Sequence, residues 1–132
     1  MKYLLDANII SALVIDPRGK VAARLDEAGQ ANVFTSIIVN AEVAFGVRKR
    51  GSAELARKVG NVVKRLYVAP FAPPADAKYA EVRADLERRG KLIGPNDLLI
   101  AAHALALEAV LVTDDKAFAA VSGLKIENWL RQ

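Results

Sequence analysis

The stretch Tyr3-Leu4-Leu5-Asp6-Ala7-Asn8-Ile9-Ile10 changes from the pattern of a strand to the pattern of a helix at one acidic residue. Its first three residues are apolar and favour a short buried strand, and the apolar run that continues to Ile15 has the length of a helix. Asp6 therefore stands at the carboxyl end of a strand, the edge at which open α/β sheets bind ligands. Because Asp is also a common helix N-cap, this position alone leaves a capping role equally open.

The same strand-to-helix unit recurs along the chain. Short aliphatic or β-branched runs predict strands at residues 2–5, 33–35, 67–69, 110–113 and 124–126, and the intervals between them have helical patterns. Parallel strands need crossover connections of this kind, so we expect an α/β fold whose mostly parallel sheet is covered by helices on both faces. A chain of 132 residues, 53% of them hydrophobic, is expected to form a single domain over residues 1–132.

Composition restricts the kind of protein and its location. The absence of cysteine excludes disulfides and thiolate metal ligands, and it fits a reducing cytoplasm. Asp6 interrupts the apolar start that a signal peptide would need, and the longest apolar stretch, residues 98–112, contains His103 and Glu108. We therefore expect a soluble, cytoplasmic protein without a membrane partner.

Glu42 lies in a helical segment, residues 37–47, that is apolar nearly all round. It shares one stripe with Ile38 and Phe45, four residues before and three after it. A buried carboxylate would have to take up a proton, pair with a base or bind a metal ion. An unidentified arginine partner or an exposed strip of helix would also explain Glu42, and both stay open.

Two further acidic positions have the same character. Asp97 is in the first turn of an apolar helix that begins at Pro95, where any helix favours an anion. Asp114 and Asp115 follow the strand at residues 110–113, and because adjacent residues cannot easily both point inward, we choose Asp115 for the site and leave Asp114 outside it. The four carboxylates Asp6, Glu42, Asp97 and Asp115 are the candidate catalytic and metal-binding residues.

Their chemistry indicates which metal would bind. Thr113, Asn8 and Asn96 are expected to hydrogen-bond these carboxylates and fix their orientation. The only histidine, His103, stands inside an apolar helix and is expected to be a satisfied core residue, so no set of His and Cys ligands exists for zinc. Oxygen ligands alone select hard cations, Mg²⁺ or Mn²⁺.

The charge of the chain is compatible with a polyanionic partner. The chain has a net charge of +4, and without the four carboxylates 19 basic residues stand against 11 acidic ones. An acidic pocket in a positive body suits an enzyme that holds a cation beside a phosphate backbone. Among the basic clusters, Arg48-Lys49-Arg50 is the best RNA-binding candidate because it continues the helix that carries Glu42.

With these residues in view, the chain resembles the PIN-domain ribonucleases, and in particular the VapC toxins of VapBC toxin-antitoxin pairs. The resemblance covers the whole chain. Leu4-Leu5-Asp6-Ala7-Asn8 is similar to the Leu-Asp-Thr-Asn start of that family, with Ala7 in place of its hydroxyl residue. Further similar segments are residues 40–47, around Glu42; residues 93–104, around Asp97, the most specific match; and residues 111–115 with 123–129.

The resemblance implies a PIN-like three-layer α/β/α domain with a sheet of four or five strands. It implies a Mg²⁺-dependent ribonuclease, with Asp6 and Asp97 as principal ligands, Asp115 completing the set and Glu42 binding the metal or orienting water. It also implies an RNA substrate cut to 5′-phosphate and 3′-hydroxyl ends, a VapB-like antitoxin that blocks the acidic pocket, a toxin homodimer, and a higher complex that reaches operator DNA through the antitoxin.

Two other functions remain open at this point. The first is a non-cleaving PIN subunit of a DNA-binding antitoxin complex that represses its own operon. The second is a phosphorylated receiver domain, which also gathers acidic residues around Mg²⁺. The receiver fits less well, because it needs a phosphoacceptor Asp at the end of a middle strand, and the third strand here ends in Val68-Ala69-Pro70.

Overall fold

The computed structural model describes residues 1–131 and builds them around one five-stranded sheet. Its strands run in the order β3-β2-β1-β4-β5, and each neighbouring pair is parallel. The strands are β1 (Tyr3–Leu5), β2 (Val33–Ser36), β3 (Tyr67–Ala69), β4 (Val110–Val112) and β5 (Ile126–Glu127). The α/β class and the five-stranded parallel sheet expected from the sequence are confirmed.

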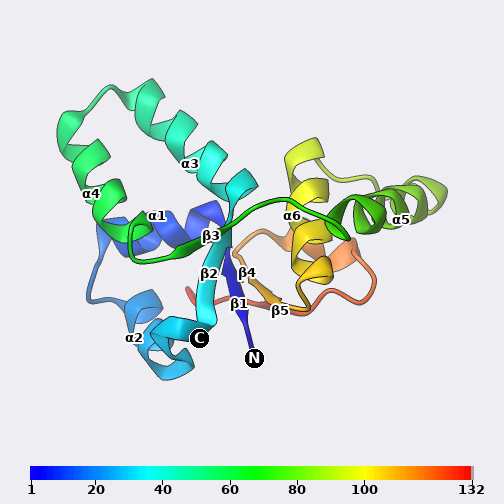
Figure 1. Cartoon of the computed structure of the whole chain (residues 1–132), viewed down its shortest axis with the longest axis horizontal. Coiled ribbons are helices and arrows are strands. Elements are labelled where there is room, and N and C mark those ends of the chain that lie inside the picture. Colours follow the sequence, from blue (N-terminus) through cyan, green and yellow to red (C-terminus); the bar gives the residue numbers. More distant parts are fainter. Residues whose placement is uncertain (132) are drawn as a thin grey trace.

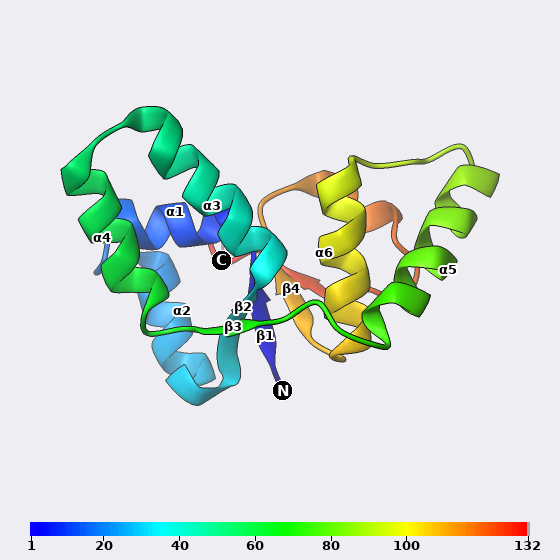
Figure 2. The same ribbon diagram turned by 45° about the horizontal axis from the view of Figure 1, so that its top comes forward.

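Helices cover both faces of this sheet. Figures 1 and 2 show α1 to α4 on one side of it and α5 and α6 on the other, which confirms the three-layer arrangement. The helices are α1 (Ala7–Ile15), α2 (Lys20–Ala28), α3 (Ile37–Arg50), α4 (Ala53–Val63), α5 (Ala75–Arg88) and α6 (Pro95–Ala106), with 3₁₀ turns η1 (Gln30–Asn32) and η2 (Lys116–Ala120). Over residues 1–131, none of the helices has the length and apolar character needed to cross a membrane.

The strand order places β1 at the centre of the sheet. From β1 the chain adds β2 and then β3 in one direction, and it then returns over the other face to add β4 on the opposite side of β1. The direction of winding therefore changes between β1 and β4. A crevice opens outside the carboxyl ends of the strands at such a point, so the fold itself selects this edge for ligand binding.

A buried aromatic residue ties the segment after β5 to the centre of the sheet. The Trp129 ring is fully buried, and its centroid lies 5.4 Å from that of Tyr3 on β1. Trp129 Nε1 donates a hydrogen bond of 2.9 Å to the Glu127 carboxylate, which also accepts one of 3.0 Å from Arg24 of α2. These contacts join α2, β5 and the segment after β5 to the central strand.

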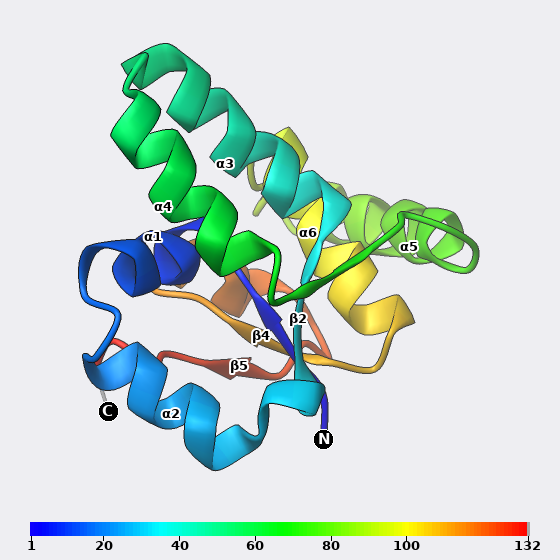
Figure 3. The same cartoon turned by 60° about the vertical axis from the view of Figure 1, so that its left-hand side comes forward.

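The helix α3 differs from expectation. Its sequence is apolar nearly all round, yet Val39 is its only buried residue, and Phe45 is 67% exposed. The reason is visible in Figure 3, where α3 and α4 form a hairpin that extends away from the sheet. The last strand also differs slightly, because it begins at Ile126 and not at Leu124.

Candidate functional site

Asp6 is the most buried of the four carboxylates, and two adjacent strands hold it. Residues Leu5 and Val112 are paired across β1 and β4, so the residues that follow them, Asp6 and Thr113, meet at the carboxyl edge. The Asp6 amide donates to the Val112 carbonyl at 2.9 Å, and Thr113 Oγ1 donates to Asp6 Oδ2 at 2.7 Å. Asp6 Oδ1 also accepts from the Ala7 amide, so the acid caps α1 and faces the crevice at once.

Asn8 links this pair to the loop after β4. Its side-chain amide lies 3.4 Å from both Asp6 Oδ2 and Thr113 Oγ1, and its carbonyl oxygen accepts a 3.1 Å hydrogen bond from the Asp114 amide. The Asp115 amide in turn donates to Thr113 Oγ1 at 3.0 Å. The expected hydrogen-bonding roles of Asn8 and Thr113 are confirmed, and together they fix the orientation of the Asp6 carboxylate.

Glu42 and Asp97 reach the same edge from the two long helices that follow β2 and precede β4. Glu42, on α3, is partly buried and accepts a 3.4 Å hydrogen bond from Asn96 Nδ2. Asp97 is in the first turn of α6, one residue from that asparagine. The side chain of Asn96 therefore connects the two carboxylate-bearing helices across the crevice, as the sequence predicted.

The protonation of these carboxylates shows that they share one electrostatic environment. Burial and, to a smaller extent, the negative charges of Asp115, Asp6 and Glu42 together raise the pKa of Asp97 to about 6. Burial likewise raises the pKa of Asp6 above its ordinary value, against the lowering effect of its hydrogen bonds, and the charge of Asp115 adds to the increase. The pKa of Glu42 is raised by burial and by the charge of Asp6, which its bond to Asn96 partly offsets. Asp97 therefore lies within electrostatic reach of the other three carboxylates.

The two aspartates after β4 have opposite surroundings. Asp114 Oδ1 accepts hydrogen bonds of 2.6 Å from Asn128 and 3.2 Å from Arg131, and these bonds lower the pKa of Asp114. The Asp115 carboxylate is exposed, and it caps η2 by accepting a 2.9 Å hydrogen bond from the Ala117 amide. Its negative charge raises the pKa of Asp6 and of Asp97. This geometry favours Asp115 over Asp114 as the fourth carboxylate. Asn128 and Arg131 were not singled out in the sequence, because nothing in their spacing marks a contact back to Asp114.

The donor set fits a hard divalent cation. Within residues 1–131, no three acidic or histidine side chains stand in an arrangement that would hold a metal ion as they are. The four groups nevertheless offer only oxygen atoms, and the pKa values of Asp6, Glu42 and Asp97 are raised by burial and by neighbouring negative charge, both of which a bound cation would offset. The assignment of Asp6, Glu42, Asp97 and Asp115 as catalytic ligands stays a prediction.

A cleft runs from Glu42 along the surface of α1, α3 and α4. It encloses about 670 Å³ and is mainly apolar, with Ile10, Val14 and Val43 among its lining residues. Lys49 and Arg50, at the end of α3, line it as well. One continuous surface thus carries the acidic edge, an apolar channel and the basic cluster.

His103 does not match its expected role as a fully satisfied core residue. It is buried, and its Nδ1 atom lies 2.8 Å from Ser36 Oγ, but Nε2 has no hydrogen-bond partner among the described residues. Burial lowers the pKa of His103, and hydrogen bonding of the ring to the backbone of Pro70 partly offsets this effect. The ring is therefore neutral at physiological pH.

Comparison with known proteins agrees with this geometry. The PIN domain family model matches residues 3–124. A protein of Rickettsia felis named ribonuclease VapC2 is 36% identical over 98% of both chains, and one of Shigella flexneri named tRNA(fMet)-specific endonuclease VapC is 29% identical over 98% of both. The crystal structure of VapBC2 from Rickettsia felis, bound to a DNA fragment from its promoter, contains a chain that superposes with a TM-score of 0.87 at 34% identity and covers 98% of this chain and 99% of its own.

Proposed function

The chain belongs to the PIN domain family, and on that basis we propose that it is a metal-dependent endoribonuclease that acts as the toxin of a toxin-antitoxin pair. The observation that carries the proposal is the convergence of four carboxylates from four separate segments at one edge of the sheet. Burial there, together with mutual repulsion, raises the pKa of Asp97 to about 6. Acidic groups that raise one another's pKa in a crevice are typical of an active site and costly anywhere else.

We propose Mg²⁺ as the ion, with Mn²⁺ as a substitute, held by Asp6 and Asp97 and completed by Asp115. PIN-domain ribonucleases generally depend on divalent metal ions, and a bound ion would acidify a water molecule and stabilise the charge that develops on the phosphoryl oxygens. Thr113 keeps the Asp6 carboxylate turned toward the crevice through its 2.7 Å hydrogen bond. Glu42, partly buried and hydrogen-bonded to Asn96, would orient the attacking water and accept its proton.

The basic end of α3 supports RNA as the substrate. Arg48, Lys49 and Arg50 form the last turn of the helix that carries Glu42, so a phosphate backbone attracted to them passes the carboxylates. Because the relative from Shigella flexneri is named as an endonuclease specific for tRNA(fMet), initiator tRNA is the first substrate to test.

We propose a VapB-like antitoxin as the partner, and promoter DNA as a ligand of the complex through that antitoxin. In the Rickettsia felis crystal structure, VapBC2 is bound to a DNA fragment from its promoter, and one chain of that assembly superposes closely on this one. The apolar cleft along α1, α3 and α4 ends beside Glu42, so a peptide lying in it would also cover the carboxylates. A toxin homodimer belongs to the same proposal, and sedimentation of the purified toxin tests it.

The decisive experiment compares two aspartates in matched positions. Asp97 and Asp76 each occupy the first turn of a helix, on α6 and α5, but only Asp97 belongs to the carboxylate cluster. We expect Asp97→Asn to lower Mg²⁺-dependent RNA cleavage by at least about a hundredfold, and Asp76→Asn to leave it within about twofold.

Full activity of the Asp97→Asn protein, or cleavage by the wild-type protein in the presence of a chelator, would contradict the proposal. If the wild-type protein binds operator DNA with its antitoxin but cuts no RNA with any divalent metal, the non-cleaving repressor subunit is the correct function.

A further inference from the structure

Side-chain contacts join the helices that carry Glu42 and Asp97 at two depths. The outer contact, from Asn96 Nδ2 to Glu42 Oε2, is 3.4 Å long and exposed to solvent. The inner contact is buried, with His103 Nδ1 of α6 at 2.8 Å from Ser36 Oγ, the residue that begins α3. The two contacts stand six residues apart along α3 and seven along α6, so each helix is held at points roughly 10 Å apart.

The inner contact anchors the start of α3 to the rest of the fold. Ser36 Oγ accepts a 3.0 Å hydrogen bond from a backbone amide in the first turn of α3, so one hydroxyl both caps this helix and meets His103. Thr35, the preceding residue, donates a 2.7 Å hydrogen bond to the Leu5 carbonyl on β1. A buried polar path therefore runs from α6, through the start of α3, to the strand that ends beside Asp6.

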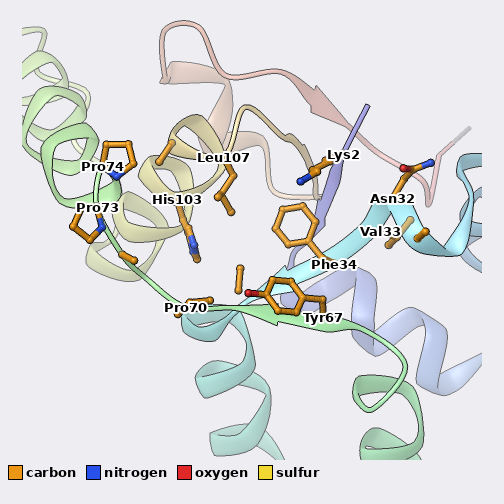
Figure 4. Close-up of a pocket in the computed structure, with 14 residues that line it drawn as sticks. Lys2, Asn32, Val33, Phe34, Tyr67, Pro70, Pro73, Pro74, His103 and Leu107 are labelled. Atoms are coloured by element: carbon orange, nitrogen blue, oxygen red, sulfur yellow. The ribbon is translucent and has the colours of Figure 1, made fainter.

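The imidazole ring of His103 is fixed in orientation by its other neighbours. Figure 4 shows the ring reaching from α6 to the strap that follows β3, where Pro70 lies. On this strap the Phe71 ring meets it edge to face, with the two centroids 5.2 Å apart. Because these contacts hold the ring in place, the position of its Nδ1 atom defines where the start of α3 must lie.

The direction of α3 depends on this anchor because the core holds the helix weakly. Val39 is its only buried residue, and together with α4 it extends away from the sheet (Figure 3). An apolar contact has no preferred direction, whereas a hydrogen bond has a preferred length and angle. Replacing both partners of a buried hydrogen bond by apolar groups of the same shape is often nearly neutral for stability, so the main effect of such a pair is on geometry.

We propose that Ser36 and His103 are positioning residues of the carboxylate cluster. Their buried hydrogen bond sets the placement of α3 against α6, and thereby the separation of Glu42 and Asp97 that a shared metal ion requires. Either tautomer of the ring can form this bond, because the serine hydroxyl both donates and accepts. The inference rests on the proposed metal-dependent nuclease function and adds to it two residues that contact neither the metal nor the RNA.

The side-chain amide of Asn96 reports on this placement in the metal-free, full-length protein, because it donates to Glu42 across the crevice. In ¹⁵N spectra we expect the Asn96 side-chain signal to shift in Ser36→Ala and in His103→Leu. Ser52→Ala is the matched control. Ser52 likewise caps a helix, α4, by accepting a 3.1 Å hydrogen bond from a backbone amide, but it is exposed at the tip of the α3–α4 hairpin. Its loss should leave the Asn96 signal in place.

Titration of the same proteins with Mn²⁺, followed by calorimetry, measures the consequence for the proposed site. Ser36→Ala and His103→Leu should each weaken Mn²⁺ binding about three- to tenfold, and the double variant should lose little more, because both changes remove the same bond. His103→Asn offers a donor and an acceptor near the position of Nδ1 and should restore most of the affinity. Ser52→Ala should stay within about twofold of the wild type, although it also removes a helix cap.

Three outcomes would overturn the inference: an Asn96 signal that stays in place in Ser36→Ala, equal Mn²⁺ affinities of Ser36→Ala and Ser52→Ala, or losses that simply add in the double variant. Ser36→Ala, the smaller change, carries the test if His103→Leu does not fold. If the wild-type protein itself binds no Mn²⁺, the proposed function fails, whereas the Asn96 signal still decides whether the two residues place α3 against α6.

Discussion

At the level of single residues, the neighbours Asp114 and Asp115 provide an internal comparison. Asp114 accepts hydrogen bonds from Asn128 and Arg131, whereas the negative charge of Asp115 raises the pKa of Asp6 and of Asp97. We expect Asp115→Asn to lower RNA cleavage at least about tenfold and Asp114→Asn to lower stability by about 1 kcal/mol with cleavage retained. Cleavage rates and urea unfolding of both variants measure this difference. The reverse pattern would move the fourth ligand to Asp114.

Thr113 is the residue on which the orientation of Asp6 depends most. Its hydroxyl donates to Asp6 and accepts from the Asp115 amide, so one side chain sets the positions of two proposed ligands. We expect Thr113→Val, which keeps the shape and removes the hydroxyl, to weaken Mg²⁺ binding about 10- to 100-fold. Thr113→Ser keeps the hydroxyl and should retain most of the affinity in a metal titration. Equal losses in both variants would indicate a packing role instead.

The sequence predicted the candidate carboxylates of the site better than it predicted the contacts of the buried residues around them. Asp6, Glu42, Asp97 and Asp115 were selected from their positions at strand ends and helix starts, and the fold brings those positions to one edge. The contact between His103 Nδ1 and Ser36 Oγ was not predicted, because a hydrogen bond depends on which group the fold brings opposite the ring. Ser36 is 67 residues away in sequence, and no local pattern announces the contact.

At the level of secondary-structure elements, the α3–α4 hairpin depends on the backbone conformation of Gly51. This residue ends α3 in the left-handed region, with φ of 65°, where a side chain costs about 1 kcal/mol. Gly60 instead lies within α4, and a Cβ added there meets no atom within 4 Å.

Gly51→Ala should therefore lower the free energy of unfolding by about 1 kcal/mol, whereas Gly60→Ala should raise it by about 0.5–1 kcal/mol. Urea unfolding of both variants measures the difference. A stabilising Gly51→Ala would show that the turn can relax out of the left-handed region.

The elements themselves followed from the sequence where local signals were strong. The range of β3 was predicted residue for residue, and α6 begins at Pro95 as its first turn required. The sequence left the exposure of α3 open, because an apolar helix surface does not reveal what covers it. Phe45 is exposed on a hairpin that extends away from the sheet.

For the whole molecule, the carboxylate cluster should make stability depend on pH in an unusual direction. Asp97 has a pKa of about 6 in the folded protein against 3.8 without the fold, and the pKa values of Asp6 and Glu42 are also raised. The folded state then binds protons more tightly than the unfolded state, so stability falls as pH rises from about 4 to 6. The melting temperature of the metal-free protein should therefore increase when the pH is lowered from about 7 to about 5.

A control variant and a metal titration test whether the carboxylate cluster causes this pH dependence of stability. Asp97→Asn removes one of the repelling charges, so it should raise the melting temperature of the metal-free protein at neutral pH and flatten the pH dependence. Mg²⁺ should raise the melting temperature of the wild-type protein through binding to the folded state and should do so much less in the variant. An unchanged pH profile in Asp97→Asn would place the effect in other groups.

The central position of β1 also has a consequence for how the protein is made. Ribosomes synthesise a chain from its amino end, so β1 and Asp6 emerge before the other strands. Strand β4, which pairs with β1, follows more than a hundred residues later. A nascent chain therefore has Asp6 without the hydrogen bond of Thr113 and without the charge of Asp115. The carboxylate cluster can form only after β4 and the loop that follows it have been synthesised. The proposed nuclease site is therefore incomplete during most of translation.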